Sequence, residues 1–512
     1  MINLKIKNVD EMSIEELVGQ VIMVGLPTTY LDQEYKKFIK DYKIGNFILF
    51  ARNYQNTLQM KSFMKDLYQH AINVTGSYPL VSIDQEGGMV VRLFKDVTFP
   101  ASPMTSSSTS IKDAPYICGY IIAKDMLKMG INLNLAPCLE INEDLINPVM
   151  NVRSYGANKE IVLKNASLFV RGLQDNGALA CIKHYPGAGS TTKDSHLELP
   201  IIDEPKEKLL NYNMYPFFNL LESKALMTSH CVYKSFDELP STLSYELLTN
   251  TLRKQAGFNG LIISDGMEMH AILDNYGIGQ GTVMALKAGC DLLLLCHEYE
   301  YQKEALDAAI KACKNGELSI EILKDKVRRI NEAKKWLLES LSKNFTDDEY
   351  IINQEEHQLM QEIVDNSFTL IKGKAPILKE NSLIIAATTK VASIVEDEFD
   401  DYNLANSLKK RFVNHDVYEF NEVSINQNVD KYDNIILYSY DAFNNQHQRI
   451  VINELLKSNK EVFVVSLKGS LDYHTFDNLT NYSCLFEYTP NSIRTIIKQL
   501  NNEILLNGIL PK

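Results

Sequence analysis

The sequence predicts an α/β protein with a (β/α)₈ TIM-type barrel over residues 1–345 and a smaller C-terminal α/β sandwich domain over residues 346–512. Three observations support this prediction. Short apolar runs alternate with helical segments through the first two-thirds of the chain. Ionisable residues stand at the C-terminal ends of several of these runs. A polar stretch at 343–356 then separates them from a second set of apolar runs. The length of 512 residues also exceeds that of one typical domain.

Apolar runs in the first part of the chain predict the strands of the barrel. Strands that are buried on both faces of a parallel sheet read as continuous apolar runs. Segments with helical spacing, such as 116–130 and 159–177, lie between most of them, which indicates βα units. A doubly wound sheet would give a similar alternation. The predicted strands are 20–25, 46–50, 79–84, 131–137, 180–185, 225–230, 260–265 and 291–296.

Polar residues at the ends of these strands favour the barrel. Asp84, Lys183, His184, His230 and Asp265 stand at the C-terminal ends of predicted strands. Barrel enzymes place their chemistry at this end. The placement therefore predicts one site built from several strands.

The chain is helical after the last barrel strand, and the stretch at 343–356 is then polar and irregular, as expected of a linker. Strand-like runs follow at 382–389, 434–440 and 461–467, with helical segments between them. These runs predict a second α/β layer structure. No motif in it indicates chemistry, so we expect a structural role or dimer contacts, with His415, His447 and His474 dispensable.

Composition limits the classes of partner. Hydrophobic residues make up 45% and charged residues 23% of the chain, as in ordinary globular proteins. The net charge of −13 argues against a nucleic-acid or anionic membrane surface. There is no apolar run of about 18 residues and no recognisable leader. The eight cysteines are scattered without a Cys-x-x-Cys pair, which predicts buried thiols, a cytoplasmic location and no metal site.

The segment KHYPGAGSTTKDSHLELP (183–200) carries the strongest chemical signal. Its prolines and glycines indicate a tight loop, which closes with Asp194 and His196. In an extended stretch, residues i and i+2 point to the same side, so Asp194 could accept a hydrogen bond from His196. That bond would orient the imidazole for proton exchange with a substrate. Taken alone, the same residues also fit a surface loop with an incidental Asp-x-His.

Three other residues stand out, although each is ambiguous alone. Asp265 ends an apolar strand, where a carboxylate could be a nucleophile, a general base, a metal ligand or a helix N-cap. Asp84 precedes two glycines and could accept hydrogen bonds from sugar hydroxyls. Arg153 offers a planar fork of donors for hydroxyls or a carboxylate.

Taken together, these segments resemble glycoside hydrolase family 3, in particular its two-domain bacterial β-N-acetylglucosaminidase branch. The KH-x-PG-x-G-x₄-DSH pattern is highly specific for this branch. The segment NSFTLIKG (366–373) is similar to the domain junction of two-domain members. Further matching segments run in order through residues 10–300: ILFARN (48–53), IDQEGG (83–88), INLNLAPCLEI (131–141), NPVMNVRSYG (147–156), MTSH (227–230), LPSTLS (239–244), GFNGLIISDGMEMHAI (257–272) and AGCDLLLL (288–295).

The resemblance implies roles for the matching residues. Asp265 would be the nucleophile that forms a covalent glycosyl-enzyme, and His196, oriented by Asp194, the acid/base. The implied reaction is exo-acting and retaining, needs no cofactor or metal, and removes terminal β-GlcNAc from glycans or cell-wall fragments such as muropeptides in peptidoglycan recycling. The sequence leaves monomer and homodimer open. The residues expected to bind the substrate are Asp84, Arg153, Lys183, His184, Arg92, His230 and Met267.

This chain departs from the family pattern at three positions. Met89 replaces the arginine that usually follows the two glycines, and Arg92 is a candidate to compensate. Ala188 replaces the histidine or threonine usual in the loop, which removes a side-chain hydrogen bond. Glu140 stands where aspartate is usual.

Three alternatives to hydrolysis of β-GlcNAc stay open. A glycoside phosphorylase is one, because a neutral histidine acid/base repels phosphate less than a carboxylate does. A related β-glycosidase with altered sugar specificity is the second, although the DSH motif differs from its usual acid/base. An inactive sugar-binding homologue is the third, suggested by Met89 and Ala188 and opposed by Asp194, His196 and Asp265.

Overall fold

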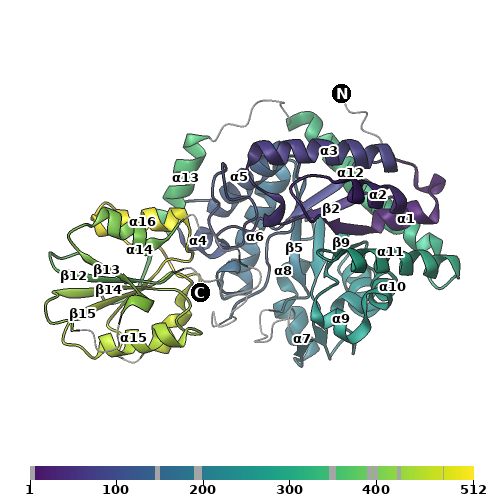
Figure 1. The fold of residues 1–512 in the computed structure, drawn as a ribbon. Helices are drawn as coiled ribbons and strands as arrows, with labels where there is room; N and C mark the ends of the chain where they lie inside the picture. Colours follow the sequence, from purple (N-terminus) through teal and green to yellow (C-terminus); the bar gives the residue numbers. More distant parts are fainter. Residues whose placement is uncertain are drawn as a thin grey trace.

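The first part of the protein is a closed barrel of eight parallel strands (Figure 1). The computed structural model describes residues 6–143, 150–188, 199–344, 353–388, 396, 402–423, 428–476 and 478–512. The barrel closes through β1 against β10, with Ile22 opposite Leu293. The eight strands coincide with the eight predicted runs, which confirms the predicted fold class. They are β1 (Ile22–Gly25), β2 (Asn46–Leu49), β3 (Leu80–Ile83), β4 (Leu133–Asn134), β5 (Leu179–Tyr185), β7 (Ala225–Thr228), β9 (Leu261–Gly266) and β10 (Leu292–Leu295).

Helices surround the barrel, and polar caps start several of them. Ser13 and Glu16 form a capping box at the first helix, and Asn158 caps the sixth. The α-helices are α1 (Ile14–Val21), α2 (Gln33–Tyr42), α3 (Thr57–Thr75), α4 (Pro103–Ser108), α5 (Ala114–Lys128), α6 (Lys159–Asp175), α7 (Lys206–Lys208), α8 (Tyr215–Phe218), α9 (His270–Tyr276), α10 (Ile278–Ala288), α11 (Tyr299–Lys314) and α12 (Ile320–Asn344). π-Helical turns cover η4 (Leu209–Asn213) and η6 (Glu246–Gln255), and β6 (Ile201–Ile202) pairs with β8 (Val232–Tyr233).

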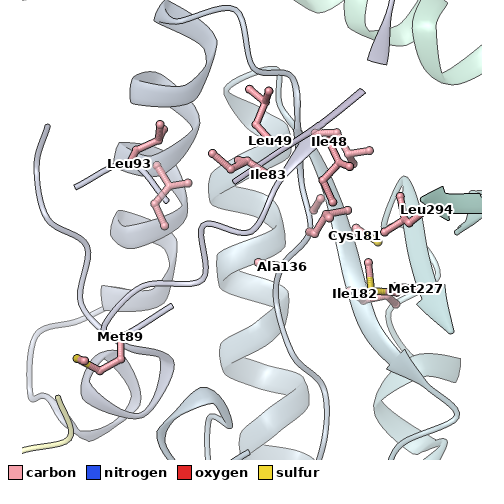
Figure 2. Close-up of a cluster of buried hydrophobic side chains, with 14 of the residues drawn as sticks. Ile48, Leu49, Ile83, Met89, Leu93, Ala136, Cys181, Ile182, Met227 and Leu294 are labelled. Carbon is pink, nitrogen blue, oxygen red and sulfur yellow. The ribbon is translucent and has the colours of Figure 1, made fainter. Parts of the chain in front are cut away.

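Apolar side chains from different strands fill the barrel. Figure 2 shows Ile48, Ile83, Ile182 and Leu294 gathered in one cluster, although they come from β2, β3, β5 and β10. All four are 2% exposed or less. Burial of this apolar surface is the main source of stability for the scaffold that carries the polar rim.

The second domain is a six-stranded mixed sheet with the order β11-β16-β15-β14-β12-β13. Helices α14 (Leu404–Arg411) and α16 (Pro490–Leu500) cover one face, and α15 (Gln446–Leu456) covers the other (Figure 1). This is the predicted α/β sandwich. Its strands are β11 (Thr369–Lys372), β12 (Ser382–Ala386), β13 (Asp416–Glu419), β14 (Asn434–Ser439), β15 (Glu461–Ser466) and β16 (Asn481–Cys484).

The predicted boundary at residue 345 falls in a segment outside the described residues, and it stays a prediction. Helix α12 reaches Asn344, and α13 (Gln354–Asp365) begins within the stretch predicted as a linker. Helix α13 contacts α4 and α5 of the barrel as well as α16 of the second domain.

All eight cysteines are buried as free thiols. Among the described residues, no helix has the length and apolar character needed to cross a membrane.

Candidate active site

Ionisable side chains meet at the C-terminal rim of the barrel. Asp84 follows β3, Lys183 and His184 lie on β5, His230 follows β7 and Asp265 lies on β9. Because all eight strands are parallel, their C-terminal ends share one rim. The structure thus brings together residues that are up to about 180 positions apart in the chain.

A buried network of four charges connects β3 to β5. The Lys183 ammonium lies 2.7 Å from Asp84 Oδ1 and 2.7 Å from Glu86 Oε1. Arg153 binds Glu86 through both arms of its fork, with Nε and NH2 each 2.8 Å from a carboxylate oxygen. Two cations therefore balance two anions, which is the condition under which buried charges are tolerated.

The pairing keeps this network charged. Burial alone would raise the pKa of Glu86, but the charges and hydrogen bonds of Arg153 and Lys183 outweigh it and hold that pKa well below its ordinary value. Burial likewise opposes the charged form of Lys183, yet Asp84 and Glu86 raise its pKa above the usual range. Glu86 is thus held as an anion by its two cationic partners.

A second buried carboxylate, Glu140, holds His184. Its Oε1 atom accepts hydrogen bonds from the His184 backbone N–H at 2.9 Å and from Nδ1 at 2.7 Å. Burial opposes ionisation, but the charge and hydrogen bonds of His184 outweigh burial and lower the pKa of Glu140. Because Nδ1 donates to Glu140, Nε2 is the nitrogen that faces Asp265.

Asp265 presents its carboxylate next to this imidazole. Its Oδ2 atom lies 4.0 Å from His184 Nε2, and its Oδ1 atom accepts the Gly266 backbone N–H at 2.8 Å. The side chain is 21% exposed, so a small molecule can reach it. This position suits a carboxylate that attacks a bound substrate.

Exposure divides the rim into two layers. Asp84, His184 and Asp265 are 16–21% exposed and line the accessible layer. Glu86, Glu140 and Lys183 are 1–3% exposed and lie beneath them. The outer layer can touch a ligand, and the inner layer fixes the geometry of the outer one.

Arg92, and not Met89, lies beside Asp84. Arg92 NH2 is 3.9 Å from Asp84 Oδ2, and its side chain is 10% exposed. Met89 is buried, and Figure 2 shows it apart from the cluster of strand side chains. A second cation beside Asp84, in addition to Lys183, therefore comes from position 92.

The structure does not bring two predicted binding residues to the accessible layer. The His230 ring is fully buried, with Nδ1 2.8 Å from Thr242 Oγ1 and Nε2 3.0 Å from the Gly266 carbonyl oxygen. It steadies the chain next to Asp265. Met267 is also fully buried and packs toward Gly281 of α10. It lies in the hydrophobic core because β9 ends at Gly266 and the alternation of the strand stops there.

Asp194 and His196 lie outside the described residues, so the structure leaves their predicted roles as predictions. Their loop leaves β5 through Gly187, whose φ of 104° suits only glycine and whose N–H donates to the His184 carbonyl oxygen at 2.8 Å. Ala188, next to it, is partly buried against the apolar core.

One group of potential metal ligands occurs among the described residues. Cys138, Glu140 and His184 bring ligand atoms within 4.8 Å of one another. Burial raises the pKa of the Cys138 thiol well above its usual value, so this side chain is a protonated thiol. The Glu140 oxygen that faces His184 already accepts two hydrogen bonds, and the Cys138 thiol donates to Glu86 Oε2 at 3.6 Å, so Glu140 alone of the other two residues is hydrogen-bonded to the imidazole.

Glu86 and Glu140 were not among the predicted site residues. The signal for Glu86 is its position two residues after Asp84 in IDQEGG, and that for Glu140 is its departure from the usual aspartate. Neither position indicates the cation that each carboxylate meets, because those partners come from distant segments.

Comparison with known proteins gives a consistent result. The profile described as "Glycosyl hydrolase family 3 N terminal domain" matches residues 13–333. Beta-hexosaminidase A of Pseudoalteromonas piscicida is 32% identical over 287 residues, which cover 52% of this chain and 48% of that protein. Beta-hexosaminidase of Glaesserella parasuis serovar 5 is 32% identical over 292 residues, which cover 56% of this chain and 84% of that protein. The chain therefore matches about half the length of the first relative.

Solved structures extend the match to both domains. A glycoside hydrolase family 3 beta-N-acetylglucosaminidase from Paenibacillus sp. str. FPU-7 has a TM-score of 0.89 and 30% identity, with 98% of each chain covered. Beta-glucoside phosphorylase BglX has a TM-score of 0.81 at 22% identity, with 98% of this chain and 94% of that chain covered, and it shares the fold.

Proposed function

The chain belongs to glycosyl hydrolase family 3, and we propose on this basis that it is an exo-acting, retaining β-N-acetylhexosaminidase that removes terminal β-GlcNAc. One observation carries the proposal: the accessible Asp265 carboxylate lies 4.0 Å from His184 Nε2 at the C-terminal rim of the barrel. The names of the relatives, beta-hexosaminidase and beta-N-acetylglucosaminidase, support the choice of sugar.

In the proposed reaction, an Asp265 oxygen forms a bond to the anomeric carbon while the bond to the aglycone oxygen breaks. His196, oriented by Asp194, gives its proton to that oxygen. Water then attacks the anomeric carbon of the glycosyl-enzyme, His196 takes a proton from it, and the Asp265 bond breaks. Two inversions give net retention. A histidine has an ordinary pKa near neutrality and suits both proton transfers.

The outer layer of the rim would hold the sugar. Asp84 accepts hydrogen bonds from hydroxyl groups and Arg92 donates to them beside that carboxylate, while Lys183 holds Asp84 in place from the inner layer. Lys183 uses two of its three N–H donors for Asp84 and Glu86. His184 contributes Nε2, and Arg153 acts through Glu86. No step of this reaction needs a metal or cofactor.

The proposed substrates are GlcNAc-terminated glycans or cell-wall fragments, including muropeptides of peptidoglycan recycling. A rim of paired carboxylates and cations fits a polyhydroxylated ring that both accepts and donates hydrogen bonds. Free, buried thiols at all eight cysteines favour a reducing compartment, and we propose a cytoplasmic location.

The test is hydrolysis of p-nitrophenyl β-GlcNAc with and without phosphate, next to other p-nitrophenyl β-glycosides. We expect free GlcNAc as the product, at a rate that phosphate does not raise, and loss of activity in Asp265→Ala. Sugar 1-phosphate as the main product would identify a phosphorylase. Faster hydrolysis of another β-glycoside would contradict the proposed sugar. If neither the wild type nor Asp265→Ala hydrolyses any glycoside of the panel, the proposal that the protein is a glycosidase is contradicted.

A further inference from the structure

We infer that the second domain is a positioning part of the sugar-binding site. It fixes, from outside the barrel, the two loops that carry Arg153 and Glu86. This inference rests on the proposed function and goes beyond it, because the sequence indicated only a structural or dimer role for this domain.

The first contact fixes the turn that carries Arg153, the 3₁₀ helix η3 (Asn151–Arg153). Gly469 follows β15 of the second domain with a φ of 97°, and a Cβ atom there would lie 2.5 Å from Asn151 Oδ1. The Tyr482 hydroxyl donates to the Gly469 carbonyl oxygen at 3.3 Å, and the neighbouring Lys468 lies in a buried ion pair with Glu396 at 3.0 Å. A rigid segment of the second domain thus abuts the start of η3.

The second contact holds the chain on the other side of Arg153. The C-terminal tail reaches the barrel domain, where the Pro511 carbonyl oxygen accepts the Ala157 N–H at 3.0 Å. The Ile509 N–H donates to the Ser108 carbonyl oxygen at 2.8 Å. A Cβ atom at Gly156 would lie 2.8 Å from the Pro511 oxygen, so the two segments touch closely. Arg153 therefore lies between two points of contact with the second domain.

The third contact reaches the loop that carries Glu86. The fully buried Glu487 accepts the Ser102 backbone N–H at 2.8 Å, and the Ser102 hydroxyl donates to the Phe486 carbonyl oxygen at 2.9 Å. Ser102 in turn packs under Gly88, where a Cβ atom would lie 2.5 Å from Ser102 Cβ. Gly88 is two residues from Glu86, so the second domain supports both partners of the Arg153–Glu86 pair.

These contacts link the second domain to the residues proposed to bind the sugar. Arg153 and Glu86 fix Lys183, and Lys183 fixes Asp84 in the accessible layer. Asp265 lies on β9, away from these loops along the order of strands in the barrel. A shift of the second domain would therefore disturb sugar binding before it disturbs the nucleophile. A misplacement of about 1 Å in such a site can cost on the order of 100-fold in kcat/KM.

The experiment compares Gly469→Leu with Gly316→Leu. Gly316 also has a positive φ, of 80°, but nothing lies within 4 Å of its built Cβ, so it controls for backbone strain alone. For p-nitrophenyl β-GlcNAc we expect Gly469→Leu to raise KM at least about tenfold and to change kcat less than about threefold. Gly316→Leu should match the wild type in KM. An unchanged KM in folded Gly469→Leu would overturn the inference.

Hydrogen exchange and a truncated chain give two further tests. The rate of amide hydrogen exchange in peptides covering 85–102 and 150–157 should rise in Gly469→Leu and not in Gly316→Leu. This measurement needs no substrate, so it does not depend on the proposed sugar. If Gly469→Leu does not fold, a chain ending at Gly508 removes the Pro511 contact, and it should show the same rise in exchange around Ala157. Unchanged exchange in these peptides would also overturn the inference. If the wild type hydrolyses no β-glycoside, that result counts against the proposed function and not against the role of the second domain.

Discussion

The Nε2 atom of His184 lies 4.0 Å from Oδ2 of Asp265, while Nδ1 of the same ring donates to Glu140 at 2.7 Å. The imidazole therefore connects a buried, charged carboxylate to an accessible one. Since Nδ1 is committed to Glu140, the ring can turn only Nε2 toward a ligand at Asp265. The orientation of this ring depends on one buried side chain.

Glu140→Gln tests that dependence. The amide keeps the shape of the side chain but loses the charge, so the hydrogen bonds to His184 weaken. Hydrogen bonds to charged groups contribute about 1.5–3 kcal/mol, so we expect kcat/KM to fall by about 10- to 100-fold. Kinetics on p-nitrophenyl β-GlcNAc check this. Glu143→Gln is the matched control because Glu143 is exposed nearby. Equal rates in both variants would show that Glu140 does not position the ring.

Arg92→Ala tests which residue takes the place of the missing arginine at position 89. Arg92 NH2 approaches Asp84 to 3.9 Å, whereas Met89 is buried. We expect Arg92→Ala to raise KM by about 10- to 100-fold, the effect of losing a hydrogen bond to a charged group. Met89→Ala should lower thermal stability, as large-to-small core changes do, and leave KM nearly unchanged. A larger rise of KM in Met89→Ala than in Arg92→Ala would reverse this assignment.

Glu86→Gln should destabilise the protein in a pH-dependent way. At pH 7 the change leaves Arg153 and Lys183 with too little negative charge, and breaking a buried pair costs about 3–5 kcal/mol. The pKa of Glu86 is lowered in the folded protein, so its carboxylate stabilises the fold above its unfolded pKa of about 4.3, and this contribution is lost as pH falls below that value. The urea midpoints of wild type and variant should therefore differ most at pH 7 and converge below about pH 4. A constant difference across this range would contradict the prediction.

Lys334→Met tests a buried cation far from the rim. The Lys334 ammonium donates to Gln20 at 2.7 Å, and burial lowers its pKa to about 7. The unfolded chain binds the extra proton between about pH 7 and 10.4, so this group makes the wild type more stable as pH rises, by up to about 1.4 kcal/mol per pH unit. We expect the stability of Lys334→Met to exceed that of the wild type most at pH 6–7 and the difference to shrink toward pH 10. Exposed Lys335→Met is the control, and a difference that is independent of pH would refute the assignment.

The barrel could be predicted from sequence because its strands are short, fully buried and strongly apolar. In the second sheet, the sequence predicted β12, β14 and β15 but missed β11, β13 and β16. Strand β13 lies at an edge, and β11, at the other edge, exposes alternate residues, while β16 (NYSC) is buried but polar in composition. Such strands are defined by their neighbours in the sheet, which no local pattern indicates.

The gathering of ionisable residues at one rim was predictable where they stand at strand ends, as at Asp84, Lys183, His184 and Asp265, while their roles stay predictions. The sequence did not indicate burial where the direction of a side chain depends on packing, as at His230 and Met267. Met267 turns into the core once β9 has ended, and His230 uses both ring nitrogens to support Thr242 and Gly266. The roles of Glu86 and Glu140 require knowledge of which cation or ring each one meets across the barrel.

Trapping of a covalent intermediate tests the central claim most directly. A 5-fluoro N-acetylglucosaminyl fluoride slows both steps, and its leaving group restores the first, so the glycosyl-enzyme should accumulate. Mass spectrometry of the intact protein and of its peptides should then show one added fluorosugar, bound at Asp265 and absent from Asp265→Ala. A label on another residue, or turnover of the reagent to an inverted product with no label, would contradict Asp265 as the nucleophile.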